Sequence, residues 1–160
     1  MRFSIVLALA LALGTTLLPP KAVQAQVLEK KVLTLAAARM MVDAAVAEAQ
    51  RNNWSAVIAV VDDGGWPILI ERMDNPMILA GVELAPGKAR TAALFRKPSE
   101  ALEGAINNGR VAATTAPFIL MKGALPVILD GQVLGAIGVS ADTPDHDVQM
   151  AKAGLAAFKP

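Results

Sequence analysis

The dipeptide Asp130-Gly131, set between two apolar runs, is the feature that most restricts how this chain can fold. Asp-Gly readily adopts the positive φ angles of a two-residue turn whose twist matches that of paired strands. Residues 125–129 and 132–139 are therefore predicted to form a tight β-hairpin. Asp63-Gly64-Gly65 interrupts a second apolar stretch, residues 56–72, in a similar way. Two hairpins predict an antiparallel sheet.

The remaining elements follow from hydrophobic periodicity and from capping residues. Four helices are expected, the first between Thr34 and Asn53 and the others in residues 86–95, 98–106 and 143–158. Five strands are expected, in residues 56–61, 66–72, 118–121, 125–129 and 132–139. This order, α-β-β-α-α-β-β-β-α, predicts an α+β fold in which helices cover a largely antiparallel five-stranded sheet.

The first 25 residues have the organisation of a secretion signal. Arg2 precedes an unbroken apolar run at residues 5–13, Pro19-Pro20 ends the apolar region, and Val23-Gln24-Ala25 supplies a small residue at the cleavage position. The run is shorter than the roughly 20 residues needed to cross a bilayer, which argues against a stable membrane anchor. Cleavage after this segment leaves residues 26–160 as a single domain, expected in the periplasm or outside the cell.

Composition excludes several classes of function. Because Arg2 and Lys21 belong to the signal, the 15 basic residues fall to 13 against 14 acidic ones, and the mature net charge is −1. A near-neutral chain without a Lys/Arg cluster is not expected to bind nucleic acid. The lack of cysteine excludes disulfides, thiolate metal sites, covalently attached haem and cysteine nucleophiles. His146 is the only histidine, and the sequence assigns neither catalytic residues nor metal ligands.

Polar residues at strand ends and on one helix are the candidate site residues. Asp62 ends the first strand beside a tight turn, and Arg72 and Asp74 end the second strand. Lys88 and Thr91 are three residues apart, which places them on one helix face. A purely structural interpretation stays open for each charged residue, with Asp62 as a turn former and the others as surface charges.

The only histidine lies among three carboxylates, Asp142, Asp145 and Asp147. This composition resembles a cluster for a hard metal ion. Thr143-Pro144 also has the pattern of a helix start, where acidic side chains favour the positive end of the helix dipole. We interpret the segment around His146 as a capped helix N-terminus.

Six successive blocks of the sequence resemble the GlcG/HbpS family. They read AVVDDGG (59–65), ERMD (71–74), GKARTA (87–92), GALPV (123–127), DG (130–131) and GAIGVS (135–140). With the last helix they cover almost all of residues 33–158. Ala124 stands where many relatives have a second glycine, and Asn75-Pro76 replaces the usual glycine after the second block. The resemblance implies a profilin-like α+β fold, homo-oligomers and, in secreted relatives, binding of haem or iron and in some cases haem degradation.

The resemblance also implies a set of cofactor-binding residues. A threonine hydroxyl is implicated as a haem ligand in relatives, and Thr91 is its counterpart here. The basic side chains of Lys88, Arg90 and Arg72 are then expected to pair with the haem propionates. With the strand-end carboxylates, the candidate binding set comprises Thr91, Lys88, Arg90, Arg72, Asp62 and Asp74.

Two functions remain open at this point. The first is an exported haem- or iron-binding protein that assists haem capture or degradation. The alternative is an enzyme acting on a small carboxylate or hydroxy acid, with Asp62 or Asp74 as base and Lys88 or Arg72 as anion clamp. Haem binding predicts a Soret band on addition of hemin, whereas the enzyme predicts a pocket of convergent polar groups.

Overall fold

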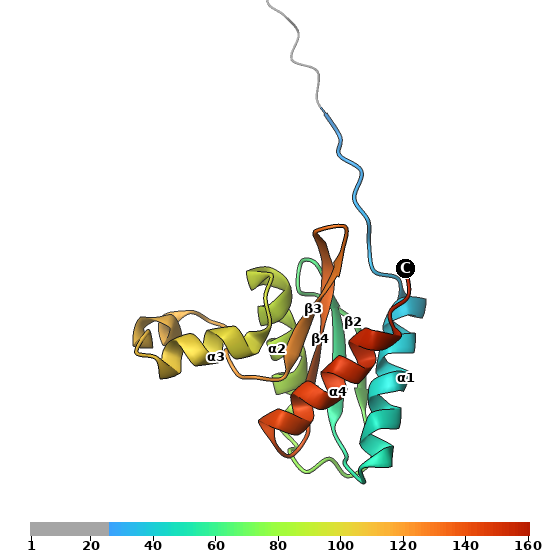
Figure 1. Cartoon of the computed structure of the whole chain (residues 1–160), viewed down its shortest axis with the longest axis vertical. Coiled ribbons are helices and arrows are strands. Elements are labelled where there is room, and N and C mark those ends of the chain that lie inside the picture. The colour runs from blue at the N-terminus through green and yellow to red at the C-terminus, as the bar shows by residue number, and fades with distance from the viewer. Residues whose placement is uncertain (1–25) are drawn as a thin grey trace, which may run out of the picture.

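A computed structural model describes residues 26–160, and the signal predicted in residues 1–25 lies outside this part of the chain. Within the described residues, no helix is both long enough and apolar enough to cross a membrane. The elements follow one another as α1, β1, β2, α2, α3, a short 3-10 helix η1, β3, β4 and α4 (Figure 1).

The sheet has four antiparallel strands, and both predicted hairpins are confirmed. The strands are β1 (Val57–Asp62), β2 (Pro67–Arg72), β3 (Ala124–Leu129) and β4 (Gln132–Ser140). Their spatial order is β2-β1-β4-β3, so the two hairpins join through the pairing of β1 with β4. Asp130 and Gly131 have φ angles of 49° and 77°, the positive values that the β3–β4 turn requires.

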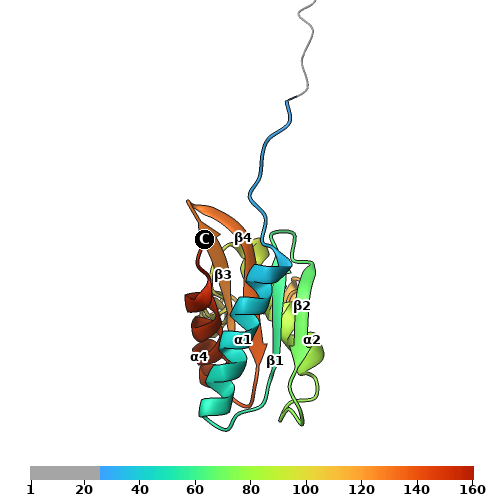
Figure 2. The same cartoon turned by 90° about the vertical axis from the view of Figure 1, so that its right-hand side faces the viewer.

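Helices cover both faces of the sheet (Figure 2). α1 (Leu35–Arg51) and α4 (Pro144–Ala157) pack against each other on one face, and α2 (Gly81–Phe95) covers the other. The side chains of Thr34 and Thr143 accept hydrogen bonds at the starts of α1 and α4, which confirms both expected caps.

β1 contributes alternately to two cores, because successive side chains of a strand point to opposite faces. Ile58 and Val60 join the core beneath α1 and α4, whereas Val61 joins a smaller core beneath α2. α2 lies very close to β4. A Cβ added to Gly138 would be 2.4 Å from Ala85 O, so this crossing requires a glycine.

The predicted fifth strand, residues 118–121, is not formed, and the sheet has four strands instead of five. The segment lies along α2. The hydroxyl of Thr91 donates to Ile119 O over 2.8 Å, and the rings of Phe95 and Phe118 meet edge to face with centroids 5.1 Å apart. Its backbone is therefore held by a helix side chain and not by a neighbouring strand, although its apolar sequence is typical of a strand.

α3 (Ser99–Asn107) and η1 (Val111–Thr115) project from the body of the domain (Figure 1). The buried hydroxyl of Ser99, at the start of α3, accepts a hydrogen bond from Ala124 N at 3.0 Å. This hydrogen bond joins α3 to β3. The Lys122 ammonium is 3.2 Å from the carboxylate of Glu100 on α3 and 2.7 Å from that of Asp145 in the first turn of α4. These contacts tie the base of the projection to the body.

Candidate functional site

Lys88 lies in the interior with its ammonium already paired. Its Nζ is 2.7 Å from Asp147 Oδ2 and donates to Val139 O at 3.2 Å. The Lys88 and Asp147 side chains are only 3% and 6% exposed. Burial raises the pKa of the Asp147 carboxyl, while the hydrogen bond from Lys88 acts in the opposite direction. The pair joins α2 to the start of α4, and this conformation does not present Lys88 to a ligand.

Thr91 is fully buried on the side of α2 that supports residues 118–121. Its hydroxyl is 2.9 Å from Gly87 O and 2.8 Å from Ile119 O. A Cβ added to Gly87 would approach Ile119 Cγ1 to 2.5 Å. Ile119 therefore packs directly against α2 at Gly87 and Thr91, which are one helical turn apart. A haem iron reaches the Thr91 hydroxyl only if this segment moves. Ligation by Thr91 therefore stays a prediction, whereas its support of Ile119 is a direct contact.

Asp62 and Arg90 lie near the turn between β1 and β2, at one end of the sheet. Asp62 Oδ1 accepts hydrogen bonds from Gly64 N at 2.9 Å and from Trp66 N at 2.8 Å, as expected of a turn former. The Arg90 guanidinium is 5.3 Å from the centroid of the Trp66 ring, a cation–π arrangement. Both candidate side chains are thus engaged in the local structure of this turn.

Arg72 and Asp74 lie at the other end of β2, where they border a groove next to Trp54. The six residues of β2, which correspond to roughly 20 Å of extended chain, run between Asp62 and Asp74. The two carboxylates consequently do not form an acid–base pair. The six candidate residues fall into three places: the interior along α2, the β1–β2 turn, and the end of β2.

A cleft that the sequence reasoning missed opens between the end of α2, α3 and η1. This α3 cleft is lined by five alanines (101, 105, 112, 113 and 116), by Leu102, Leu120 and Phe95, and by the two cations Lys97 and Arg110. Its volume is about 420 Å³, within the range of small-molecule sites. The sequence predicted the helix in residues 98–106 but no element at residues 111–115, so the wall that η1 forms opposite α3 was not expected.

Thr91 lies behind one wall of the α3 cleft. It holds the carbonyl of Ile119, and the next residue, Leu120, lines the cleft. Phe95, one helical turn further along α2, also lines the cleft and packs against Phe118. A change at Thr91 therefore alters the position of the cleft wall without any contact between its hydroxyl and a ligand.

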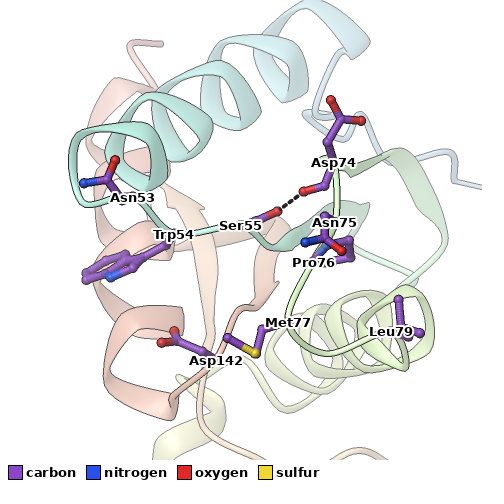
Figure 3. Close-up of a pocket in the computed structure, with 9 residues that line it drawn as sticks. All are labelled: Asn53, Trp54, Ser55, Asp74, Asn75, Pro76, Met77, Leu79 and Asp142. Atoms are coloured by element: carbon purple, nitrogen blue, oxygen red, sulfur yellow. Dashed lines mark hydrogen bonds between the residues drawn. The ribbon is translucent and has the colours of Figure 1, made fainter.

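A second concave surface lies where three loops meet at the end of β2 (Figure 3). This loop pocket is lined by Asn53, Trp54 and Ser55 after α1, by Asp74, Asn75, Pro76, Met77 and Leu79 after β2, and by Asp142 after β4. Its volume is about 530 Å³. The Ser55 hydroxyl donates to Asp74 O at 2.5 Å and so joins two of the three loops.

His146 supports the loop pocket from α4. Its ring stacks on Trp54 with centroids 3.7 Å apart, and its Nδ1 is 2.7 Å from Asp142 Oδ1. This hydrogen bond is the main cause that lowers the pKa of the Asp142 carboxyl below its usual value. The His146 amide donates to Thr143 Oγ1 at 3.2 Å, which confirms the helix-capping interpretation. In residues 26–160, no three His, Cys, Asp or Glu side chains are grouped so as to hold a metal ion.

The fold and the sequence place the chain in a class of small α+β domains, one of which is known as a haem complex. The PduOC:haem complex matches with a TM-score of 0.72 and 25% identity, over 79% of this chain and 95% of the other. A doubly substituted HbpS from Streptomyces reticuli matches with a TM-score of 0.78 and 27% identity, over 86% of this chain and 97% of the other. Protein GlcG of Escherichia coli strain K12 is 45% identical over 112 residues, which are 69% of this chain and 83% of GlcG.

The model of a family described as haem degrading protein HbpS-like matches residues 33–156. The chain belongs to this HbpS-like family, which confirms the resemblance carried by its six sequence blocks.

Proposed function

We propose that this protein is an exported haem-binding protein that holds haem in the α3 cleft and assists haem capture or degradation. The observation that carries the proposal is the composition of the cleft, in which apolar walls adjoin Lys97 and Arg110 and no lining residue is acidic. Membership of the HbpS-like family and the likeness to the PduOC:haem complex support haem as the ligand.

The α3 cleft fits both parts of a haem molecule, a flat apolar macrocycle and two propionates at one edge. Its alanine side chains are short enough to pack against a flat ring, and its two cations suit the propionates. The lining contains no His, Cys, Met or Tyr, the usual axial ligands of haem iron. Apolar contact and ion pairing would therefore hold the ring, which favours reversible capture. Bound haem would supply the iron centre that any degradation requires.

Export and self-association belong to the same proposal. The signal pattern of residues 1–25 supports export, and a mature mass beginning at Gln26 would test it. Association is supported by apolar side chains at the surface, among them Trp66 and Val111, which are 66% and 64% exposed. Light scattering at micromolar concentration tests association, and a mass of one chain alone would count against it.

A hemin titration followed by absorbance tests the haem site. The parent protein should give a saturable Soret shift. Arg110→Glu should weaken hemin binding about tenfold, or 1.4 kcal/mol, because a propionate then meets a like charge. Ala105→Trp should obstruct the cleft and abolish the shift.

Lys152→Glu is the matched control, since this exposed lysine on α4 undergoes the same change of charge away from the cleft. It should bind hemin as the parent does. Equal affinity in the parent, Arg110→Glu and Ala105→Trp would show that haem does not occupy the α3 cleft. A parent without any saturable shift would remove haem binding itself.

A further inference from the structure

We propose that two copies of this chain associate through β2, which pairs with β2 of the second copy in antiparallel orientation about a two-fold axis. This inference rests on the self-association proposed above and assigns the surface that carries it. β2 lies at one edge of the sheet, and no strand of the described residues pairs with its outer side (Figure 2). Unpaired N–H and C=O groups at a sheet edge are a template for another strand. Pairing of the two edges would join both sheets into a single one.

The opposite edge of the sheet, formed by β3, is closed. Ser99 Oγ accepts a hydrogen bond from Ala124 N at 3.0 Å, on the side of β3 that faces away from β4. Pro126, two residues further along β3, has no N–H to offer to another strand. Because alternate residues of a strand direct their backbone groups to the same side, Ala124 and Pro126 occupy consecutive outward positions. The available edge is therefore that of β2.

β2 has free amides at its outward positions. Met73 N donates to Ala56 O at 3.0 Å, so the backbone of Met73 faces the β1 side. In an antiparallel ladder successive residues face the two sides alternately, so Arg72 and Ile70 direct their N–H and C=O groups to the outer edge. The only proline of β2, Pro67, is its first residue and leaves both positions free. A two-fold axis at Ile70 lets this residue exchange two hydrogen bonds with its own copy.

The side chain of Ile70 favours the same axis. Ile70 is paired with Ala59, which belongs to a small core with Ala85 of α2, so Ile70 points to the face that α2 covers. It nevertheless remains 42% exposed at the edge of that face. The Cβ atoms of residues directly opposite in an antiparallel pair are about 5 Å apart. Each Ile70 would therefore cover its copy and remove apolar surface from water.

The position of α1 agrees with this axis. α1 packs against both β1 and β2. A helix centred over these two strands lies about 5 Å from the axis, because neighbouring strands are about 4.8 Å apart. The two α1 helices would then lie about 10 Å from each other, a normal distance for packed helices. The strand pairing and the helix contact are thus compatible with one two-fold axis.

The charges on α1 are complementary to their own copy. Arg39 donates to Glu71 of β2, which places Arg39 on the side of α1 above the edge strand. Asp43 follows one helical turn later and takes part in no ion pair with another described residue. In the antiparallel helices of a two-fold dimer, Arg39 of one copy faces Asp43 of the other, and the contact occurs twice.

This surface fits a second copy better than an unrelated extended peptide. A peptide of any sequence could bind the backbone groups of β2. A second copy also places an isoleucine against Ile70 and opposite charges against Arg39 and Asp43. Such a self-complementary surface is what a two-fold interface requires.

Disulfide formation can test the interface, because the chain has no cysteine of its own. In Ile70→Cys the two Cα atoms would lie about 5.5 Å apart across the axis, within the range of a disulfide. Oxidation of the mature protein should convert Ile70→Cys into a covalent dimer on a non-reducing denaturing gel. Ile128→Cys is the matched control, since Ile128 is a 50% exposed isoleucine on β3, the other edge strand. It should remain largely a single chain.

Light scattering measures the same interface without a disulfide. Ile70→Lys places two like charges opposite each other and should halve the mass measured for the parent, whereas Ile128→Lys should leave it unchanged. A parent with the mass of one chain would overturn self-association and this interface together. An associated parent whose mass survives Ile70→Lys, or equal cross-linking of the two cysteine variants, would overturn the β2 interface alone. Hemin enters none of these measurements, so the haem proposal is tested separately.

Discussion

The buried pair of Lys88 and Asp147 allows a quantitative prediction. Lys88→Met keeps much of the apolar stem of the side chain but removes the ammonium from a pair that is 2.7 Å apart. The Asp147 carboxylate then stays buried with the hydrogen bond from Ala141 N. Loss of one partner from a buried ion pair typically costs about 3–5 kcal/mol, a large part of the stability of a small domain. We expect a loss of this size in the free energy of unfolding at pH 8.

The loss should depend on pH in a defined direction. Burial raises the pKa of Asp147, and Lys88 is the largest influence that lowers it, so Lys88→Met raises this pKa further. Between the unfolded value, about 3.9, and the raised folded value, the folded state binds more protons than the unfolded state. The carboxyl therefore makes folding less favourable as the pH rises through that window. Lys88→Met should accordingly lose less stability at pH 5 than at pH 8.

Urea unfolding followed by circular dichroism at both pH values measures these differences. Lys152→Met, at an exposed lysine, is the control and should change stability by less than about 0.5 kcal/mol at either pH. In the double variant Lys88→Met/Asp147→Asn, no buried charge is left unpaired, and the loss should be at least about 2 kcal/mol smaller than the sum of the single losses. Additive losses, or an equal loss from Lys88→Met at pH 5 and pH 8, would refute the reasoning.

Three further predictions concern α2, α3 and the α3 cleft. Gly138→Ala should destabilise the domain by about 3 kcal/mol in urea unfolding, because its Cβ meets Ala85 O at 2.4 Å and backbone atoms cannot easily move aside. Gly104→Ala, with no atom within 4 Å of the new Cβ, should instead stabilise α3 by about 0.5–1 kcal/mol, and a loss there would contradict this account. Thr91→Val should weaken hemin binding up to about tenfold through the wall of the α3 cleft, while His146→Ala should not. A spectrophotometric titration in which His146→Ala weakens hemin binding and Thr91→Val does not would contradict haem binding in the α3 cleft.

The local elements of this fold could be predicted from neighbouring residues. Asp130-Gly131 indicated the β3–β4 hairpin because the turn depends only on the φ angles that these two residues accept. Thr34 and Thr143 indicated the starts of α1 and α4 because a cap is a hydrogen bond to an amide three residues away. Such interactions are complete within a few residues, and the sequence alone therefore determines them.

The fifth strand and the candidate site depended on partners that are distant in sequence. Residues 118–121 are apolar enough for a strand, but their backbone partner is Thr91, 28 residues before Ile119. Lys88 could equally have been a surface charge, and its burial follows from Asp147, 59 residues away. The α3 cleft exists only because η1 folds opposite α3. Only the tertiary structure decides these features, because burial and ion pairing depend on which elements pack across from a residue, and the local sequence does not encode that choice.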